Sequence, residues 1–204
     1  MFVPLRAQSN YSFMEGASHP EELVEACAAL GIPAVGVADR DGVYGVARAY
    51  ARGRELGVKV IGGVTVSAHP HLDLVLLARD ASGWSDLCEA ISHAQARAPK
   101  GSARWDPSDL GLLGEGVLAI WSCAARRPGA EAVAWVSRAA ACLPGRHHAA
   151  LVRHHAPGDR ERELTTRALA KEHGAPLVAA PRVLYHAATR RPLQDVLTCA
   201  RRVL

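Results

Sequence analysis

Short runs of apolar residues alternate along the chain with longer stretches in which apolar positions recur at helical spacing. Several short runs are continuous and β-branched, which is typical of strands covered on both faces. The predicted strands are Phe2–Leu5, Ala34–Ala38, Val58–Val66, Leu72–Ala78, Val117–Trp121, Ala149–Val152 and Leu177–Ala180. The predicted helices are Pro20–Leu30, Tyr44–Leu56, Trp84–Ala96, Ala130–Leu143, Glu161–His173 and Leu193–Leu204. This alternation, repeated about seven times, indicates an α/β protein with a parallel sheet and favours a βα barrel over an open sheet.

Local signals mark where several of these helices begin and end. The run Ser18-His19-Pro20-Glu21 has the form of a capping box with Pro in the first helical turn. Gly31, Gly57 and Gly174 follow predicted helix ends, where a left-handed backbone conformation is often needed. These signals support the helical periodicity at those ends.

The length and composition place the chain among ordinary globular proteins. Its 204 residues are 49% hydrophobic and 22% charged, which excludes a disordered tail, a collagen-like fibre and a membrane bundle. The longest irregular segment is residues 98–116, and the strand–helix pattern resumes unchanged after it. We therefore predict a single domain over residues 1–204, with residues 98–116 as a loop or lid. The N-terminal residues lack the apolar segment of a signal peptide.

Cysteine usage and charge bear on compartment and partners. The five Cys are widely spaced and odd in number, which predicts reduced thiols of a cytoplasmic protein with no membrane association. The net charge of +4 comes from 21 Arg and 3 Lys against 20 acidic residues, and residues 144–204 alone carry +6. A basic C-terminal third is compatible with binding to DNA or to an acidic partner. The alternative is that the arginine content reflects a GC-rich genome.

In a βα barrel the chemistry lies at the carboxyl ends of the strands. The segments that follow the predicted strands contain recognisable motifs, as do the helices after them. The motifs are Ser9-Asn10-Tyr11-Ser12, Gly16-Ala17-Ser18, Asp39, Tyr44-Gly45, Val60-Ile61-Gly62-Gly63, Leu76-Leu77-Ala78-Arg79-Asp80 and Arg191-Pro192-Leu193-Gln194-Asp195-Val196-Leu197-Thr198. Over essentially the whole chain, this set resembles the PHP (polymerase and histidinol phosphatase) domain at the start of bacterial C-family DNA polymerases. The last of these motifs, together with the run Gly16-Ala17-Ser18-His19-Pro20-Glu21-Glu22-Leu23, looks most like the damage-inducible, error-prone branch, a DNA polymerase III alpha-type family.

The resemblance implies a distorted (β/α)7 barrel of the PHP type. It also implies a site for up to three divalent metal ions, held by His, Asp, Glu and sometimes Cys side chains. In metal-bearing members that site supports phosphoester hydrolysis, including 3′–5′ exonuclease activity. Clustered metal ions generate hydroxide and stabilise both oxygens of the displacement.

The departures from the family pattern weaken this metal site. Arg6 and Gln8 stand at the positions of its His-x-His motif, and Arg40 replaces the His that follows Asp39. Guanidinium has no lone pair to give to a metal. Further family ligands are lost at Val64, Pro181, Arg182 and Leu184. The residual candidate ligands are Asp39, Asp73, Cys123 and His154, so we predict no metal cofactor and no catalytic residue.

Arg6, Arg40 and Arg182 are expected to line the former pocket. One of them beside Asp39 would replace a metal ion as counter-charge, and the sharper hypothesis is that all three bind an anion such as phosphate. The motif His69-Pro70-His71 is interpreted as a solvated turn at the opposite end of the barrel from the site, because Pro70 interrupts a strand. Two histidine pairs, His147-His148 and His154-His155, flank the sixth predicted strand, and His154 is the best candidate among them for a residual pocket residue.

Three functions follow from these observations. The leading hypothesis is a catalytically silent domain of an error-prone polymerase, which packs against the polymerase core or other proteins of DNA replication and translesion repair. Such a domain should expose an apolar patch on its last helix, at Leu193, Val196, Leu197, Val203 and Leu204. The alternatives are a phosphoesterase or 3′–5′ exonuclease that uses Zn²⁺ or Mn²⁺ on a rearranged ligand set, and a basic nucleic-acid-binding module.

Overall fold

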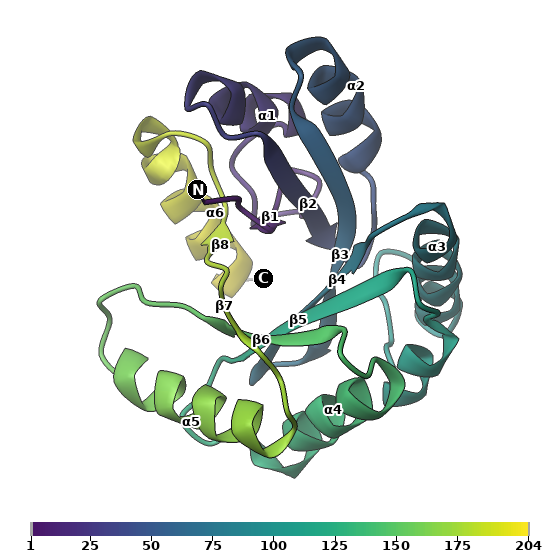
Figure 1. The fold of residues 1–204 in the computed structure, drawn as a ribbon. Coiled ribbons are helices and arrows are strands. Elements are labelled where there is room, and N and C mark those ends of the chain that lie inside the picture. Colours follow the sequence, from purple (N-terminus) through teal and green to yellow (C-terminus); the bar gives the residue numbers. More distant parts are fainter. Residues whose placement is uncertain (1, 204) are drawn as a thin grey trace. The chain divides into compact units, whose positions relative to one another are not determined.

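The computed structural model describes residues 2–203 and has strands alternating with helices (Figure 1). The chain divides into two compact units. The first unit joins Met1–Val64 with Arg182–Leu204, and the second is Thr65–Pro181. The strands of the described residues follow the order β7-β6-β5-β4-β3-β2-β1-β8, and the α/β class is as predicted.

The first unit contains strands, α-helices and the short 3-10 helix η2 (Ala188–Arg190). Its strands are β1 (Arg6–Ala7), β2 (Ala34–Arg40) and β8 (Arg182–Val183), and its helices are α1 (Pro20–Ala29), α2 (Val46–Leu56) and α6 (Arg191–Val203). Strand β1 lies between β2 and β8 and is parallel to both, with Ala7 opposite Val37 and Arg6 opposite Arg182. Helices α1 and α2 lie side by side (Figure 1). The apolar run predicted the first strand over Phe2–Leu5, and this was wrong, because the strand lies at Arg6–Ala7 directly after it.

The second unit holds most of the buried apolar side chains. Its elements are β4 (Leu72–Ala78), α3 (Ala81–Ala96), the 3-10 helix η1 (Pro107–Leu112), β5 (Val117–Cys123), α4 (Gly129–Cys142), β6 (His147–Leu151), α5 (Asp159–Glu172) and β7 (Leu177–Ala179). Strand β3 (Lys59–His69) begins in the first unit and ends in the second. The continuous apolar runs at β4 and β5 fit strands that are covered on both faces. Their side chains are almost completely buried, with Leu74, Ile120 and Trp121 at most 1% exposed.

The sheet is not parallel throughout, contrary to the prediction. Strand β4 pairs with β5 in the antiparallel sense, with Leu72 opposite Cys123 and Ala78 opposite Val117, whereas β5, β6 and β7 are parallel. The physical reason is that β4 follows β3 after a short connection and so reverses the direction of the chain. Only Pro70 and His71 separate these strands, and a two-residue connection is too short for the crossover that a parallel pair requires.

Two other local predictions can be compared with the structure. Gly31, Gly57 and Gly174 have φ between 65° and 70°, as predicted for residues that end helices. Ser18, in contrast, is not the N-cap of α1. The N-cap is His19, whose backbone N–H donates to Glu22 Oε2 at 2.8 Å. Ser18 is buried instead, and its hydroxyl accepts a hydrogen bond from the backbone N–H of His186.

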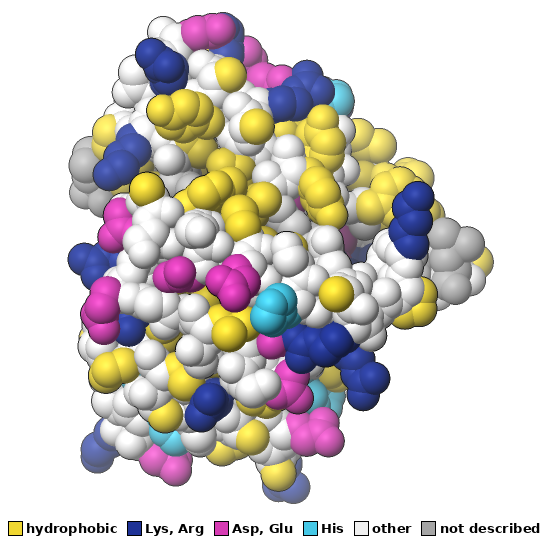
Figure 2. Space-filling view, turned by 90° about the vertical axis from the view of Figure 1, so that its right-hand side faces the viewer, with side chains coloured by type: hydrophobic (Ala, Val, Ile, Leu, Met, Phe, Trp, Pro, Cys, Tyr) yellow, Lys and Arg dark blue, Asp and Glu magenta, His cyan; other side chains and the backbone are white. Residues whose placement is uncertain are grey.

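Residues 98–116, predicted as a loop or lid, contain the short helix η1. The side chains of Trp105 and Leu110 are buried there, so part of this segment contributes to the core. Elsewhere hydrophobic side chains reach the surface, and Figure 2 shows several of them grouped between charged ones on the face that it draws. Among the described residues, no helix combines the length and the apolar character that crossing a bilayer requires.

Candidate functional site

Asp39 is the best-placed residue of the predicted site, and the chain's own donors occupy its carboxylate. It lies near the end of β2 with no exposed surface. Ser9 donates to it from its backbone N–H at 2.7 Å and from its hydroxyl at 2.9 Å. The Ser12 hydroxyl donates at 2.8 Å and the Gly45 N–H at 3.1 Å. A carboxylate offers about four acceptor sites, so a metal ion could reach Asp39 only by displacing these bonds.

Two glycines let the backbone approach closely enough to make this arrangement. A Cβ atom added to Gly45 would lie 2.4 Å from Asp39 Oδ2, and one added to Gly16 would lie 2.0 Å from the backbone oxygen of Ser9. Ser12 also accepts the backbone N–H of Arg40 through its hydroxyl at 2.9 Å. The Ser9–Ser12, Gly16–Ser18 and Tyr44-Gly45 motifs thus serve the local structure around Asp39.

A second carboxylate, that of Glu15, lies at the centre of three arginines. Its Oε1 is 2.6 Å from Arg40 Nη1 and 2.5 Å from Arg201 Nη1, and its Oε2 is 2.5 Å from Arg182 Nη2. Gln8 donates to Oε2 at 3.3 Å and accepts from Arg182 Nε. We call Glu15, Arg40, Arg182 and Arg201 the arginine cluster. Its members come from the loop after β1, the end of β2, strand β8 and helix α6.

The structure brings most of the predicted pocket residues of the first unit together. Arg6 is 2% exposed and lies opposite Arg182 in register, so both side chains leave the same face of the sheet. Val64 is completely buried in β3. Leu184 accepts the backbone N–H of Ala17 through its backbone oxygen. At the family ligand positions of this unit, Gln8 and Arg182 are hydrogen-bonded, Arg40 pairs with Glu15, and Arg6 and Val64 are buried.

Sequence reasoning missed Glu15 and Arg201. Neither residue stands in one of the metal-ligand motifs, and the two are separated by 186 positions. Only the docking of α6 beside the loop after β1 brings them together. Glu15 alone carried a weak signal, because it lies between two recognised motifs.

The remaining candidate ligands, Asp73, Cys123 and His154, belong to the second unit, together with Pro181, which is half-buried. Asp73 lies opposite Ser122, whose hydroxyl is 3.4 Å from Asp73 Oδ2. Burial raises the pKa of the Cys123 thiol above its usual value, which disfavours the thiolate that binds metals. His154 is exposed. In residues 2–203 no group of three or more His, Cys, Asp and Glu side chains is arranged to hold a metal ion.

The turn His69-Pro70-His71 lies at a different end of the sheet from the one predicted. Because β4 runs antiparallel to β5, the start of β4 lies beside the carboxyl end of β5, where Ala124 N–H donates to the backbone oxygen of His71. His69 Nε2 is 3.4 Å from Glu131, and the two imidazole rings meet edge to face at 5.2 Å. The two histidines therefore contact each other, and His69 also contacts Glu131 of α4.

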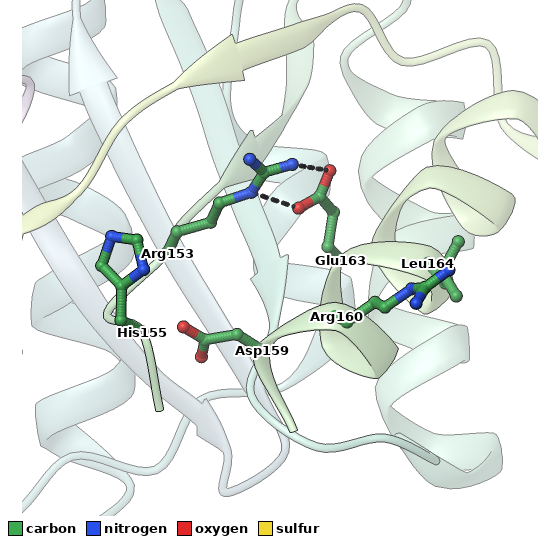
Figure 3. A pocket seen from close by; sticks show the side chains of 6 residues that line it. All are labelled: Arg153, His155, Asp159, Arg160, Glu163 and Leu164. Atoms are coloured by element: carbon green, nitrogen blue, oxygen red, sulfur yellow. Dashed lines mark hydrogen bonds and ion pairs between the residues drawn. The ribbon is translucent and has the colours of Figure 1, made fainter. Parts of the chain in front are cut away.

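The second unit also contains a pocket of about 380 Å³ at the start of α5 (Figure 3). It is lined by Arg153, His155, Asp159, Arg160, Glu163 and Leu164. Arg153 donates two hydrogen bonds to the Glu163 carboxylate, of 2.6 and 3.0 Å, which are drawn as dashed lines in Figure 3. Bonds from Arg153 and Arg167 lower the pKa of Glu163 to about 2. Asp159 accepts the backbone N–H groups of His154 and Ala156. Both carboxylates of this pocket are thus engaged by the protein itself.

Comparison with known sequences identifies the family. The sequence model of the PHP domain matches residues 4–170. The chain belongs to the PHP family. The match ends before β8 and α6, so Arg182 and Arg201 of the arginine cluster lie beyond it.

Relatives of this PHP domain include long polymerases. It is 36% identical to an error-prone DNA polymerase of Anaeromyxobacter sp. (strain K), over 98% of this chain and 18% of the relative. It is 35% identical to an error-prone DNA polymerase of Pseudomonas fluorescens, over 98% of this chain and 19% of the relative. The chain therefore spans about a fifth of the length of the relatives it matches.

Solved structures confirm the predicted PHP-type fold. An amidohydrolase from Chromobacterium violaceum aligns with a TM-score of 0.54 at 15% identity, covering 91% of this chain and 88% of that one. A protein described as a metal-dependent phosphoesterase from Bifidobacterium adolescentis aligns with a TM-score of 0.57 at 16% identity, covering 91% and 87%. At these identities the likeness concerns the fold alone.

Proposed function

We propose that this PHP domain is a non-catalytic part of an error-prone type DNA polymerase, in which the protein's own hydrogen bonds and ion pairs stand in place of the family's metal ions. The observation that supports the proposal is that groups of the protein itself already bind the carboxylates of Asp39 and Glu15. Asp39 is occupied by four internal donors, and Glu15 by three guanidinium groups. Metal-bearing sites need several deprotonated ligands that are free to bind. In this chain cationic side chains stand where such ligands would be, so hydrolysis through Zn²⁺ or Mn²⁺ is not expected.

A hydrolysis assay tests this proposal. The chain is incubated with Zn²⁺ or Mn²⁺ and either bis-p-nitrophenyl phosphate or 3′-labelled single-stranded DNA, alongside a double variant Asp73→Asn, His154→Ala. Equal background rates for both proteins are expected. A rate that depends on the metal and is lost in the double variant would overturn the proposal and establish the phosphoesterase alternative.

The interaction role rests on the exposed face of α6. A shallow apolar groove of about 620 Å³ runs along this helix, and it is lined by Asp195, Val196, Cys199, Ala200 and Val203. Of the predicted patch, Leu193, Val196 and Val203 are exposed, Leu197 is half-buried, and Leu204 lies outside the described residues. In the relatives the matched segment belongs to a chain about five times as long. We take the polymerase portion of such a chain as the occupant of this groove, in replication and translesion repair.

A binding experiment tests that assignment. The portion of the Anaeromyxobacter polymerase outside the matched segment is mixed with this chain, and complex formation is measured by size-exclusion chromatography and calorimetry. Val196→Asp, at a residue 65% exposed, should weaken the complex at least tenfold. Leu164→Asp, at a residue 58% exposed on α5, is the matched control and should not. No complex, or an equal loss in both variants, would contradict the assignment.

The proposal places the domain in the cytoplasm. All five cysteines are free thiols, at Cys27, Cys88, Cys123, Cys142 and Cys199, and this fits a reducing compartment.

A further inference from the structure

The arginine cluster has more positive charge than its central carboxylate can balance. Glu15 offers one negative charge to the three guanidinium groups of Arg40, Arg182 and Arg201. Arg40 is also paired with Asp41, whose Oδ2 is 3.6 Å from Arg40 Nε. A surplus of cationic groups held this close together is an attractive position for an anion.

The cluster also keeps donors available for a ligand. Each guanidinium has five N–H donors arranged as a planar fork, and each gives a single one to Glu15. The Glu15 side chain is 6% exposed, whereas those of Arg40, Arg182 and Arg201 are 45%, 30% and 38% exposed. The carboxylate is therefore at the base of the cluster, and the part that solvent reaches belongs to the guanidinium groups.

The forks are held in place before any ligand arrives. Arg182 is fixed from two directions, by Gln8 at Nε and by Glu15 at Nη2. Arg40 is fixed at Nη1 by Glu15, and its backbone N–H is bound to Ser12. A guanidinium that is already positioned loses little conformational entropy on binding, and its fork matches the oxygens of phosphate.

We propose that the arginine cluster binds a phosphate group, a ligand site beyond the structural role given above. In this site Glu15 positions the three arginines, and their remaining N–H donors bind the phosphate oxygens. The phosphate could come from a free anion or from the end of a nucleic-acid strand. Exposed aromatic side chains lie close in sequence, Tyr11 and Phe13 before Glu15 and Tyr44 after Asp41, and such rings are the kind on which bases stack.

Binding of inorganic phosphate and of oligothymidylate with a 5′-phosphate or a 5′-hydroxyl tests the proposal. Calorimetry and fluorescence anisotropy are the measurements, on the wild-type chain at low and moderate salt. We expect saturable binding of phosphate. If inorganic phosphate binds and neither strand does, the ligand is a free anion. If the 5′-phosphorylated strand binds and inorganic phosphate displaces it, the ligand is a strand end. Absence of saturable binding by any of the three probes would overturn the proposal.

Variants separate the site from general basicity. Arg201→Gln should weaken phosphate binding at least tenfold. Arg202→Gln, at the exposed neighbouring position on α6, is the matched control and should change it less than twofold. Arg40→Gln, at the most exposed arginine of the cluster, gives a second test if Arg201→Gln does not fold. Equal losses in the cluster and control variants would also overturn the proposal. Failure here leaves the metal and hydrolysis measurements unaffected, so the two proposals can fail separately.

Discussion

Glu15 and Arg201 are 186 positions apart in the sequence, and their side chains meet at 2.5 Å. This ion pair ties α6 to the loop after β1, and the same carboxylate also binds Arg40 at the end of β2 and Arg182 in β8. One buried carboxylate thus connects four segments of the first unit.

Removing that carboxylate should destabilise the first unit. Glu15→Gln keeps the shape of the side chain but withdraws the charge that holds three guanidinium groups. Because these arginines are partly exposed and can be solvated, we expect a loss of about 1–2 kcal/mol rather than the larger cost of an isolated buried charge. Urea unfolding measures it. Glu89→Gln, at an exposed position of α3, is the control. Equal stability of the Glu15 variant and the wild type would contradict a connecting role for this carboxylate.

The close approaches around Asp39 predict intolerance of small substitutions. Gly16→Ala should destabilise the fold by more than about 2 kcal/mol, because the added methyl would overlap the backbone oxygen of Ser9. Gly45→Ala should act in the same direction by displacing Asp39. Gly111→Ala is the control, since its methyl would meet only the flexible end of Arg138 at 3.1 Å. Thermal unfolding of the three variants compares them, and similar midpoints would refute the packing described here.

The buried histidine His147 predicts a dependence of stability on pH. Burial, followed by the charges of His148 and His173, lowers its pKa below the ordinary value of 6.5. The unfolded chain therefore binds the proton more readily than the folded chain, and stability should fall as the pH drops from about 6.5 toward the lowered pKa. His147→Gln should flatten this dependence, whereas His93→Gln, at an exposed position of α3, should leave it unchanged. The urea unfolding midpoint is measured across this pH range. If it depends on pH equally in His147→Gln and in the wild type, His147 is not the group responsible.

Most strands and helices could be predicted because each leaves a local record in the sequence. Strand β5 is a continuous apolar run since both its faces are covered, and α2 ends at Gly57 since its backbone turns left-handed there. The direction of β4 could also have been predicted, because the five residues between the predicted strands Val58–Val66 and Leu72–Ala78 are too few for a crossover. The alternation of strands and helices did not reveal this direction, because periodicity indicates the type of each element and not the relative direction of neighbouring strands.

The candidate site was predictable only in part. Arg6, Asp39 and Arg182 were found because they occupy positions of a known motif. The partners that define their roles are set by tertiary structure, as with Glu15 and Arg201, or by hydroxyl groups that suggest no ligand, as with Ser9 and Ser12. Ser18 looked like a helix cap, but it bonds to His186 from the far end of the chain instead.

Metal content measures directly whether the internal hydrogen bonds and ion pairs of this chain stand in place of metal ions. The chain is purified without a chelator and without an affinity metal, incubated with Zn²⁺ and Mn²⁺, desalted, and assayed by plasma mass spectrometry. We expect a stoichiometry near zero, unchanged in Asp73→Asn and His154→Ala. Two or more tightly held metal ions per chain would contradict it, because Asp39 and Glu15 would then have to exchange their internal donors for metal.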